Sequence, residues 1–104
     1  MTIQELTAEM NRFVEAMGWY RKDSPWEQTP RNIAISLSLE AAEVLEHFQW
    51  SERSDRDALA EELADVALYL LQLADLTGDL TGIDLEQAIL KKLAINYNRE
   101  WSKE

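Results

Sequence analysis

The chain is predicted to be all-α, with four helices in one domain spanning residues 1–104. Apolar residues recur at helical spacing through several long segments. Three Gly and two Pro leave little material for the tight turns of a β protein. Hydrophobic residues make up 46% of the chain, which favours a folded domain over disorder.

The first helix is expected to begin after Thr2, because residues 2–5, TIQE, have the pattern of a capping box. Apolar side chains then follow at helical spacing as far as Met17, and Gly18 is the expected stop. The next segment, residues 19–29, is rich in aromatic and polar side chains and is expected to form a loop.

The second helix is expected to begin at Pro30, because proline at the first helical position leaves no N–H unsatisfied. The apolar residues of 33–39 alternate as in a strand, but nothing separates them from 40–50, so length favours one helix of about 19 residues. This helix has two apolar flanks: Ile33, Leu37, Val44 and Phe48 on one, and Ile35, Leu39, Ala42 and Leu45 on the other. Such a helix is central, and one short chain can hardly cover it, so a homodimer or homotetramer is expected.

The third helix follows a short connection, and short connections join antiparallel neighbours. Ser54 or Asp55 is expected to cap this helix, and Gly78 to end it. Residues 84–87, DLEQ, have the pattern of a further cap, for a fourth helix that ends near residue 98. The second and third helices are therefore expected to form a hairpin.

Charge and composition exclude several classes of partner. Twenty acidic and ten basic residues give a net charge of −10, which argues against nucleic acid, because that affinity comes from Lys and Arg. The absence of cysteine excludes disulfides and thiolate metal sites. No apolar run approaches the roughly 20 residues that span a bilayer. The polar N-terminus does not resemble a signal peptide, so a cytoplasmic protein without membrane contact is expected.

Two acidic pairs lie in the polar stripes of the predicted hairpin, whose members are Ser36, Glu40, Glu43 and His47 on the second helix and Glu62, Asp65, Tyr69 and Gln72 on the third. Residues three apart share a helix face. The pairs lie at similar distances from the connection, so all four carboxylates are expected to come level. Unpaired charges crowded in this way are unfavourable unless a cation neutralises them.

An all-oxygen donor set suits Mg²⁺, with Mn²⁺ as the alternative, and Mg²⁺ commonly accompanies phosphate. A di-iron bundle fits less well, because it needs histidine on two helices and His47 is the only histidine. His47 is expected beside the ligands or on the surface.

Each of these features also has a purely structural interpretation. Acids on helices usually form a solvated face, and this interpretation suffices for Glu9, Glu15, Glu46, Glu52, Glu61 and Glu86. Trp26 and Trp50 flank the acidic helix and are either partly buried anchors or surfaces on which a nucleobase stacks. The basic cluster Lys91, Lys92 and Arg99 either balances charge at a helix C-terminus or contacts phosphate oxygens.

The segments PRNIAISLSLEAAEVLEHFQW and EELADVALYLLQLAD resemble the MazG-like all-α nucleotide pyrophosphohydrolases, above all the small single-domain subgroup that includes dCTP pyrophosphatase. The signature of that family is Glu-x-x-Glu, a short helical hairpin and then Glu-x-x-Asp. It matches here at Glu40, Glu43, Glu62 and Asp65. The resemblance implies a four-helix MazG-like bundle, assembled as dimers or tetramers whose active sites draw on more than one chain.

The resemblance also implies an enzyme that uses Mg²⁺ to hydrolyse a nucleoside triphosphate to the monophosphate and pyrophosphate. Nucleotide-pool cleansing is the implied use, with dCTP-like substrates as candidates. The four acids are the metal ligands, and Glu40 and Glu43 are also the catalytic candidates, with Glu43 expected to orient or deprotonate water. The residues expected to contact substrate are Trp26, Trp50, Lys92, Asn96 and Arg99. The alternative is a helical oligomerisation or regulatory module without turnover.

Overall fold

The computed structural model describes residues 1–78 and 81–99, and this part of the chain contains four α-helices and no strand. They are α1 (Ile3–Ala16), α2 (Pro30–Glu46), α3 (Arg56–Leu76) and α4 (Leu85–Asn98). The all-α prediction is confirmed. The alternating residues 33–39 lie inside α2, so length was the correct criterion there. None of the described helices combines the length and hydropathy that crossing a membrane requires.

Each helix begins at the cap that the sequence predicts. At α1 the backbone N–H of Glu5 donates to Thr2 Oγ1 at 3.1 Å, and the N–H of Thr2 donates to Glu5 Oε1 at 3.1 Å. The capping residues of the other three helices are Thr29, Asp55 and Asp84. Side-chain oxygens thus accept hydrogen bonds from N–H groups that have no partner within the helix, which fixes where each helix starts.

Gly78 follows the C-cap of α3 in a backbone conformation that other residues rarely adopt, with φ of 142°. A Cβ at this position would lie 1.9 Å from the carbonyl oxygen of Thr81. The turn that ends α3 therefore requires glycine, as predicted.

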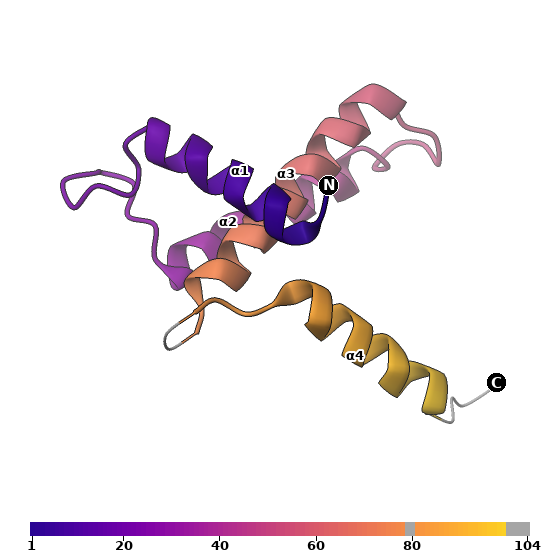
Figure 1. Ribbon diagram of the computed structural model, residues 1–104. Coiled ribbons are helices and arrows are strands. Elements are labelled where there is room, and N and C mark those ends of the chain that lie inside the picture. The colour runs from indigo at the N-terminus through magenta and orange to yellow at the C-terminus, as the bar shows by residue number, and fades with distance from the viewer. Residues whose placement is uncertain (79–80, 100–104) are drawn as a thin grey trace.

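The α2 and α3 helices form an antiparallel hairpin, α1 lies across α3, and α4 extends away from the other three (Figure 1). The buried core joins Met10 and Val14 of α1 to Leu71 of α3. Partly buried apolar residues complete this core, namely Ile3, Trp19 and Leu85. Leu85 is the first residue of α4, so the fourth helix is attached to the core at its N-terminal end.

A single chain covers one of the two apolar flanks predicted for α2 except at Phe48, and leaves the other flank uncovered. Ile33 is 3% exposed, whereas Ile35, Leu39 and Leu45 on the other flank are 47%, 62% and 73% exposed. The α4 helix has no buried residue at all. The four predicted helices are confirmed, but α1–α3 form the packed body, and much apolar surface stays uncovered in one chain.

Candidate active site

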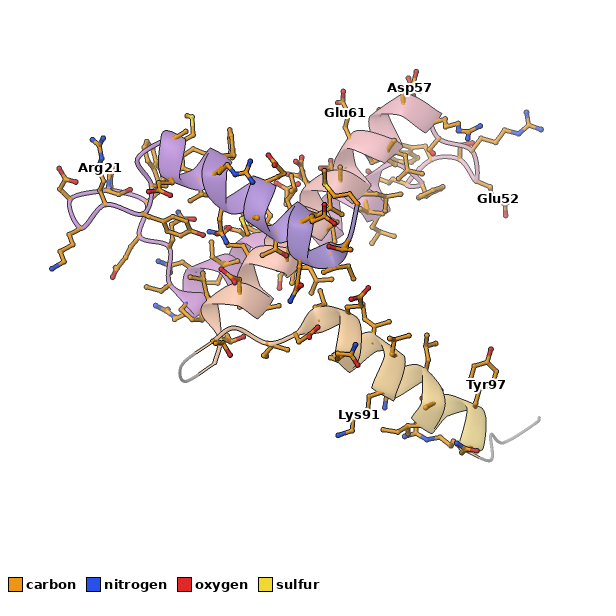
Figure 2. All side chains as sticks on the ribbon, in the orientation of Figure 1. Arg21, Glu52, Asp57, Glu61, Lys91 and Tyr97 are labelled. Carbon is orange, nitrogen blue, oxygen red and sulfur yellow. The ribbon has the colours of Figure 1, made fainter. Side chains whose placement is uncertain are left out.

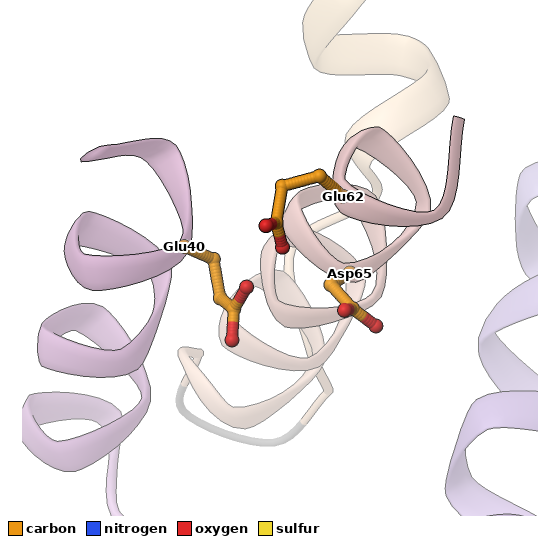
Figure 3. Close-up of side chains that lie close together, drawn as sticks. All are labelled: Glu40, Glu62 and Asp65. Atoms are coloured by element: carbon orange, nitrogen blue, oxygen red, sulfur yellow. The ribbon is translucent and has the colours of Figure 1, made fainter. Parts of the chain in front are cut away.

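Three carboxylates meet between the two helices of the hairpin. Glu40 comes from α2, and Glu62 and Asp65 come from α3. Each offers a carboxylate oxygen, and these oxygens all lie within 4.8 Å of one another. Figure 3 shows Glu40 reaching toward α3 and Glu62 reaching toward α2. We call these three residues the acidic cluster.

Glu43, the fourth predicted acid, is exposed and lies outside the acidic cluster. Glu62 and Asp65 have the same spacing of three residues on α3 and both join the cluster, so spacing along the helix does not by itself decide which acids converge. The Glu43 carboxylate is nevertheless close enough to raise the pKa of Glu40. The structure thus groups three of the four acids tightly and places the fourth at the edge of the group.

The electrostatics of Glu40 are set by the neighbouring acids and by burial. The neighbouring Glu62 carboxyl, burial and the Glu43 carboxylate, in that order of importance, together raise the pKa of Glu40 from 4.5 to about 7. Glu40 Oε2 is buried and accepts no hydrogen bond from any described residue. A buried acceptor beside other acceptors calls for a proton or a cation. The oxygen donors therefore fit a hard divalent ion such as Mg²⁺.

His47 lies beside the acidic cluster, as expected. Its Nε2 is 3.6 Å from Glu62 Oε1, and both side chains are largely shielded from solvent. His47 is the C-cap residue of α2, which places it at the hairpin end of the site. At this distance the imidazole can hold Glu62 in place when protonated, without being one of the clustered oxygens.

Two neighbouring hollows lie along the hairpin, and one of them borders the acidic cluster. The acidic hollow, of about 430 Å³, is lined by Glu40 and Asp65 together with residues of α1. The loop hollow, of about 440 Å³, is lined by residues 25–28, Asn32, Ile33 and Ser36. Both share Trp19, Tyr69 and Gln72. Asp65, Tyr69 and Gln72 are spaced by four and three residues, so one face of α3 runs through both hollows.

The five predicted substrate contacts fall into two groups. Trp26 lines the loop hollow and is 66% exposed. Trp50 is 90% exposed and lines neither hollow. Lys92, Asn96 and Arg99 lie on α4 or at its C-cap, and none of the described α4 residues lines either hollow. Figure 2 shows Lys91 and Tyr97 projecting from the same helix, far from the hairpin.

Several residues of the hollows had no role in the sequence-based site. They are Trp19, Gln28, Asn32, Ser36, Tyr69 and Gln72. The signal for Tyr69 and Gln72 was present, because both continue the polar stripe of Asp65 along an otherwise apolar helix. Gln28 carried no such signal, since its position depends on the course of the loop before α2.

Comparison with known proteins shows the family to which the chain belongs. Residues 35–104 match the MazG-like family, and the chain belongs to it. Mouse dCTP pyrophosphatase 1 is 35% identical over 92 residues, covering 77% of this chain and 52% of that protein. The human protein is 36% identical with the same coverage. The chain thus spans about half the length of these curated relatives.

A solved structure resembles the whole described fold. The crystal structure of a pyrophosphatase from Archaeoglobus fulgidus superposes with a TM-score of 0.72 at 34% sequence identity. The similarity covers 93% of this chain and 93% of that one. The four-helix arrangement therefore occurs in a second protein of nearly equal extent.

Proposed function

We propose that this chain, acting as a single domain, hydrolyses (deoxy)nucleoside triphosphates to the monophosphate and pyrophosphate with Mg²⁺, in the service of nucleotide-pool cleansing. The observation that carries the proposal is the acidic cluster, whose oxygens converge within 4.8 Å. The family supports the reaction, since its relatives include proteins named dCTP pyrophosphatase. dCTP is therefore one of the candidate substrates.

Glu40, Glu62 and Asp65 are proposed to hold Mg²⁺, with Glu43 completing the set from the edge of the cluster. The bound ion would neutralise charge on the phosphate oxygens. Glu43 is also the candidate for positioning the attacking water, because it is exposed and has no place among the three clustered oxygens. Its carboxylate would accept the proton of that water. Trp26 offers an aromatic face to the base at the rim of the loop hollow.

Lys92, Asn96, Arg99 and Trp50 are proposed to act on the site of a second copy. Within one chain, the described part of α4 contributes nothing to the hollows. The uncovered flank of α2, with Leu39 and Leu45 exposed, provides an apolar surface for such a copy. A homodimer or homotetramer would cover this surface and could bring basic side chains to phosphate.

The test is pyrophosphate release from a panel of canonical and modified nucleoside triphosphates, with Mg²⁺ and with EDTA. We expect Mg²⁺-dependent release, and at least a hundredfold loss of kcat in Glu43→Gln with helical content unchanged by circular dichroism. Glu61→Gln is the matched control, because Glu61 is exposed on α3 and points outward (Figure 2). Normal turnover by Glu43→Gln would refute the role of Glu43, and no release from any triphosphate would refute the proposed function.

A further inference from the structure

Gln72 is the most buried polar residue in the described chain, with 3% of its surface exposed. It lies on α3 and lines both the acidic hollow and the loop hollow. A buried amide has two N–H donors and one oxygen acceptor, and all of them need partners. Which of these groups faces the hollows decides what Gln72 can recognise.

One chain of hydrogen bonds fixes the orientation of Gln72 from the loop. Gln28 Nε2 donates to the backbone carbonyl oxygen of Trp26 at 2.7 Å. A carbonyl oxygen only accepts, so the Gln28 amide must place its nitrogen there and its Oε1 on the other side. Gln72 Nε2 donates to this Oε1 at 2.7 Å.

A second chain of hydrogen bonds fixes the same orientation from α1. Asn11 Nδ2 donates to the carboxylate of Asp75 at 2.8 Å, which leaves Asn11 Oδ1 as an acceptor. The hydroxyl of Tyr20 donates to Asn11 Oδ1. The Tyr20 oxygen is then the acceptor for Gln72 Nε2, at 3.4 Å. Burial raises the pKa of Tyr20, which keeps the hydroxyl proton in place for this arrangement.

Both chains of hydrogen bonds end at groups that only accept, the Trp26 carbonyl oxygen and the Asp75 carboxylate. Together they allow only one orientation of the Gln72 amide. Its two N–H groups are directed to Gln28 and Tyr20, and its Oε1 accepts no hydrogen bond from any residue of the described chain. We propose that Gln72 is a specificity-determining residue whose Oε1 accepts a hydrogen bond from the exocyclic amino group of the substrate's base. The inference rests on the proposed function and names the part of the nucleotide that this residue reads.

The spacing along α3 agrees with this role. Gln72 lies seven residues beyond Asp65 on the same helix, a rise of about 10.5 Å. This is of the order of the distance from the phosphates of a nucleotide to the far edge of its base. The aromatic side chains of Trp19 and Tyr69 border the same space and provide flat apolar surfaces for a ring.

An acceptor at this position discriminates between bases that differ in one group. Cytosine and adenine carry an amino group where uracil and hypoxanthine carry a carbonyl oxygen, and a carbonyl facing Oε1 places two acceptors together. A buried acceptor without a donor is costly, so such sites reject the wrong partner strongly. We expect kcat/KM for dCTP to exceed that for dUTP, and kcat/KM for dATP to exceed that for dITP.

The experiment compares these two ratios in the full chain and in Gln72→Met, which keeps the length of the side chain and removes its polar atoms. We expect each ratio to fall about tenfold in the variant. Gln4→Met is the matched control, since Gln4 is an exposed residue of α1, and it should leave the ratios unchanged. Each ratio is internal to one protein, so a lower folded fraction does not alter it.

Two variants of Gln28 test the orientation itself and also serve if Gln72→Met does not fold. Gln28→Met removes the acceptor that holds Gln72 Nε2, and should lower the ratios. Gln28→Glu keeps an acceptor for Gln72 Nε2 and should preserve both kcat/KM ratios, even if its added charge slows turnover. Lowered ratios in both variants would show a merely structural role and overturn the orientation argument.

The inference would be overturned if the kcat/KM ratios of dCTP to dUTP and of dATP to dITP were near or below one in the unmodified protein, or if they were unchanged in Gln72→Met. In either case, Mg²⁺-dependent pyrophosphate release would still uphold the proposed function. Release from none of the four triphosphates would overturn both. The two failures are therefore distinguishable in one assay.

Discussion

Replacing Glu40 by Gln removes a charge from the acidic cluster and should stabilise the metal-free protein at pH 8. Glu62, burial and Glu43 together raise the pKa of Glu40 from 4.5 to about 7, so between these pH values the folded chain holds a proton that the unfolded chain has released. Because the folded pKa is the higher one, the free energy of unfolding falls as the pH rises through this window and stays low above it. The Gln side chain has no such penalty.

The magnitude follows from the same pKa. Each pKa unit corresponds to about 1.4 kcal/mol, so the rise from 4.5 to about 7 sets an upper limit of about 3 kcal/mol. Water reaches the cluster at the exposed Asp65 and screens its charges, so we expect about 1–2 kcal/mol. For a domain of this size, this raises the melting temperature by about 5–10 °C.

The assay is thermal unfolding by circular dichroism at pH 5 and pH 8, in EDTA and in Mg²⁺, at one protein concentration. In EDTA at pH 8, the melting temperature of Glu40→Gln should be higher than that of the unmodified protein. This difference in melting temperature should be smaller at pH 5. In Mg²⁺ the order should reverse, because binding to the folded state stabilises the unmodified protein and the variant has lost a ligand. Glu61→Gln is the control, with an exposed acid of the same helix.

Two results would refute this reasoning. A variant no more stable than the unmodified protein in EDTA at pH 8 would show that the clustered carboxylates do not repel one another. If Mg²⁺ does not raise the melting temperature of the unmodified protein, the proposed metal site is refuted. That result would favour a helical module without turnover.

Two further predictions concern the metal and the base. The Mg²⁺ concentration for half-maximal activity should fall about tenfold between pH 6 and pH 8, because the proton on Glu40, whose pKa is raised to about 7, competes with the ion; a constant value in a Mg²⁺ titration would contradict this competition. Trp26→Ala should raise KM about tenfold, because the base loses its stacking partner. Trp26→Phe keeps an aromatic ring and should have a KM close to that of the unmodified protein. Equal KM values in steady-state assays of all three proteins would exclude Trp26 from the substrate site.

The sequence predicted the helices and the convergence of three of the four acids, because both depend on local spacing, but it wrongly placed Glu43 in the same group. The caps at Thr2 and Asp55 and the glycine at 78 are readable within a few residues. The short connection between α2 and α3 makes the hairpin antiparallel, which brings Glu40 level with Glu62. These inferences need no knowledge of the rest of the chain.

The sequence could not predict features that depend on the course of loops. The position of α4 depends on the segment between Leu76 and Leu85, and no pattern in that segment states its direction. The contact of Gln28 with Gln72 joins residues 44 apart and depends on how the loop before α2 returns to the hairpin. For the same reason, the polar stripe of α3 revealed that Gln72 was unusual without revealing its partners.

The arrangement separates chemistry from selection within one site. The acidic cluster belongs to two paired helices, whose rise fixes its distance from Gln72 whatever the loops do. The orientation of Gln72 depends instead on Gln28 and Tyr20, which lie in the loop between α1 and α2. A substitution in that loop can therefore change which base is accepted while the carboxylates keep their geometry, so base preference should be more easily altered than metal dependence.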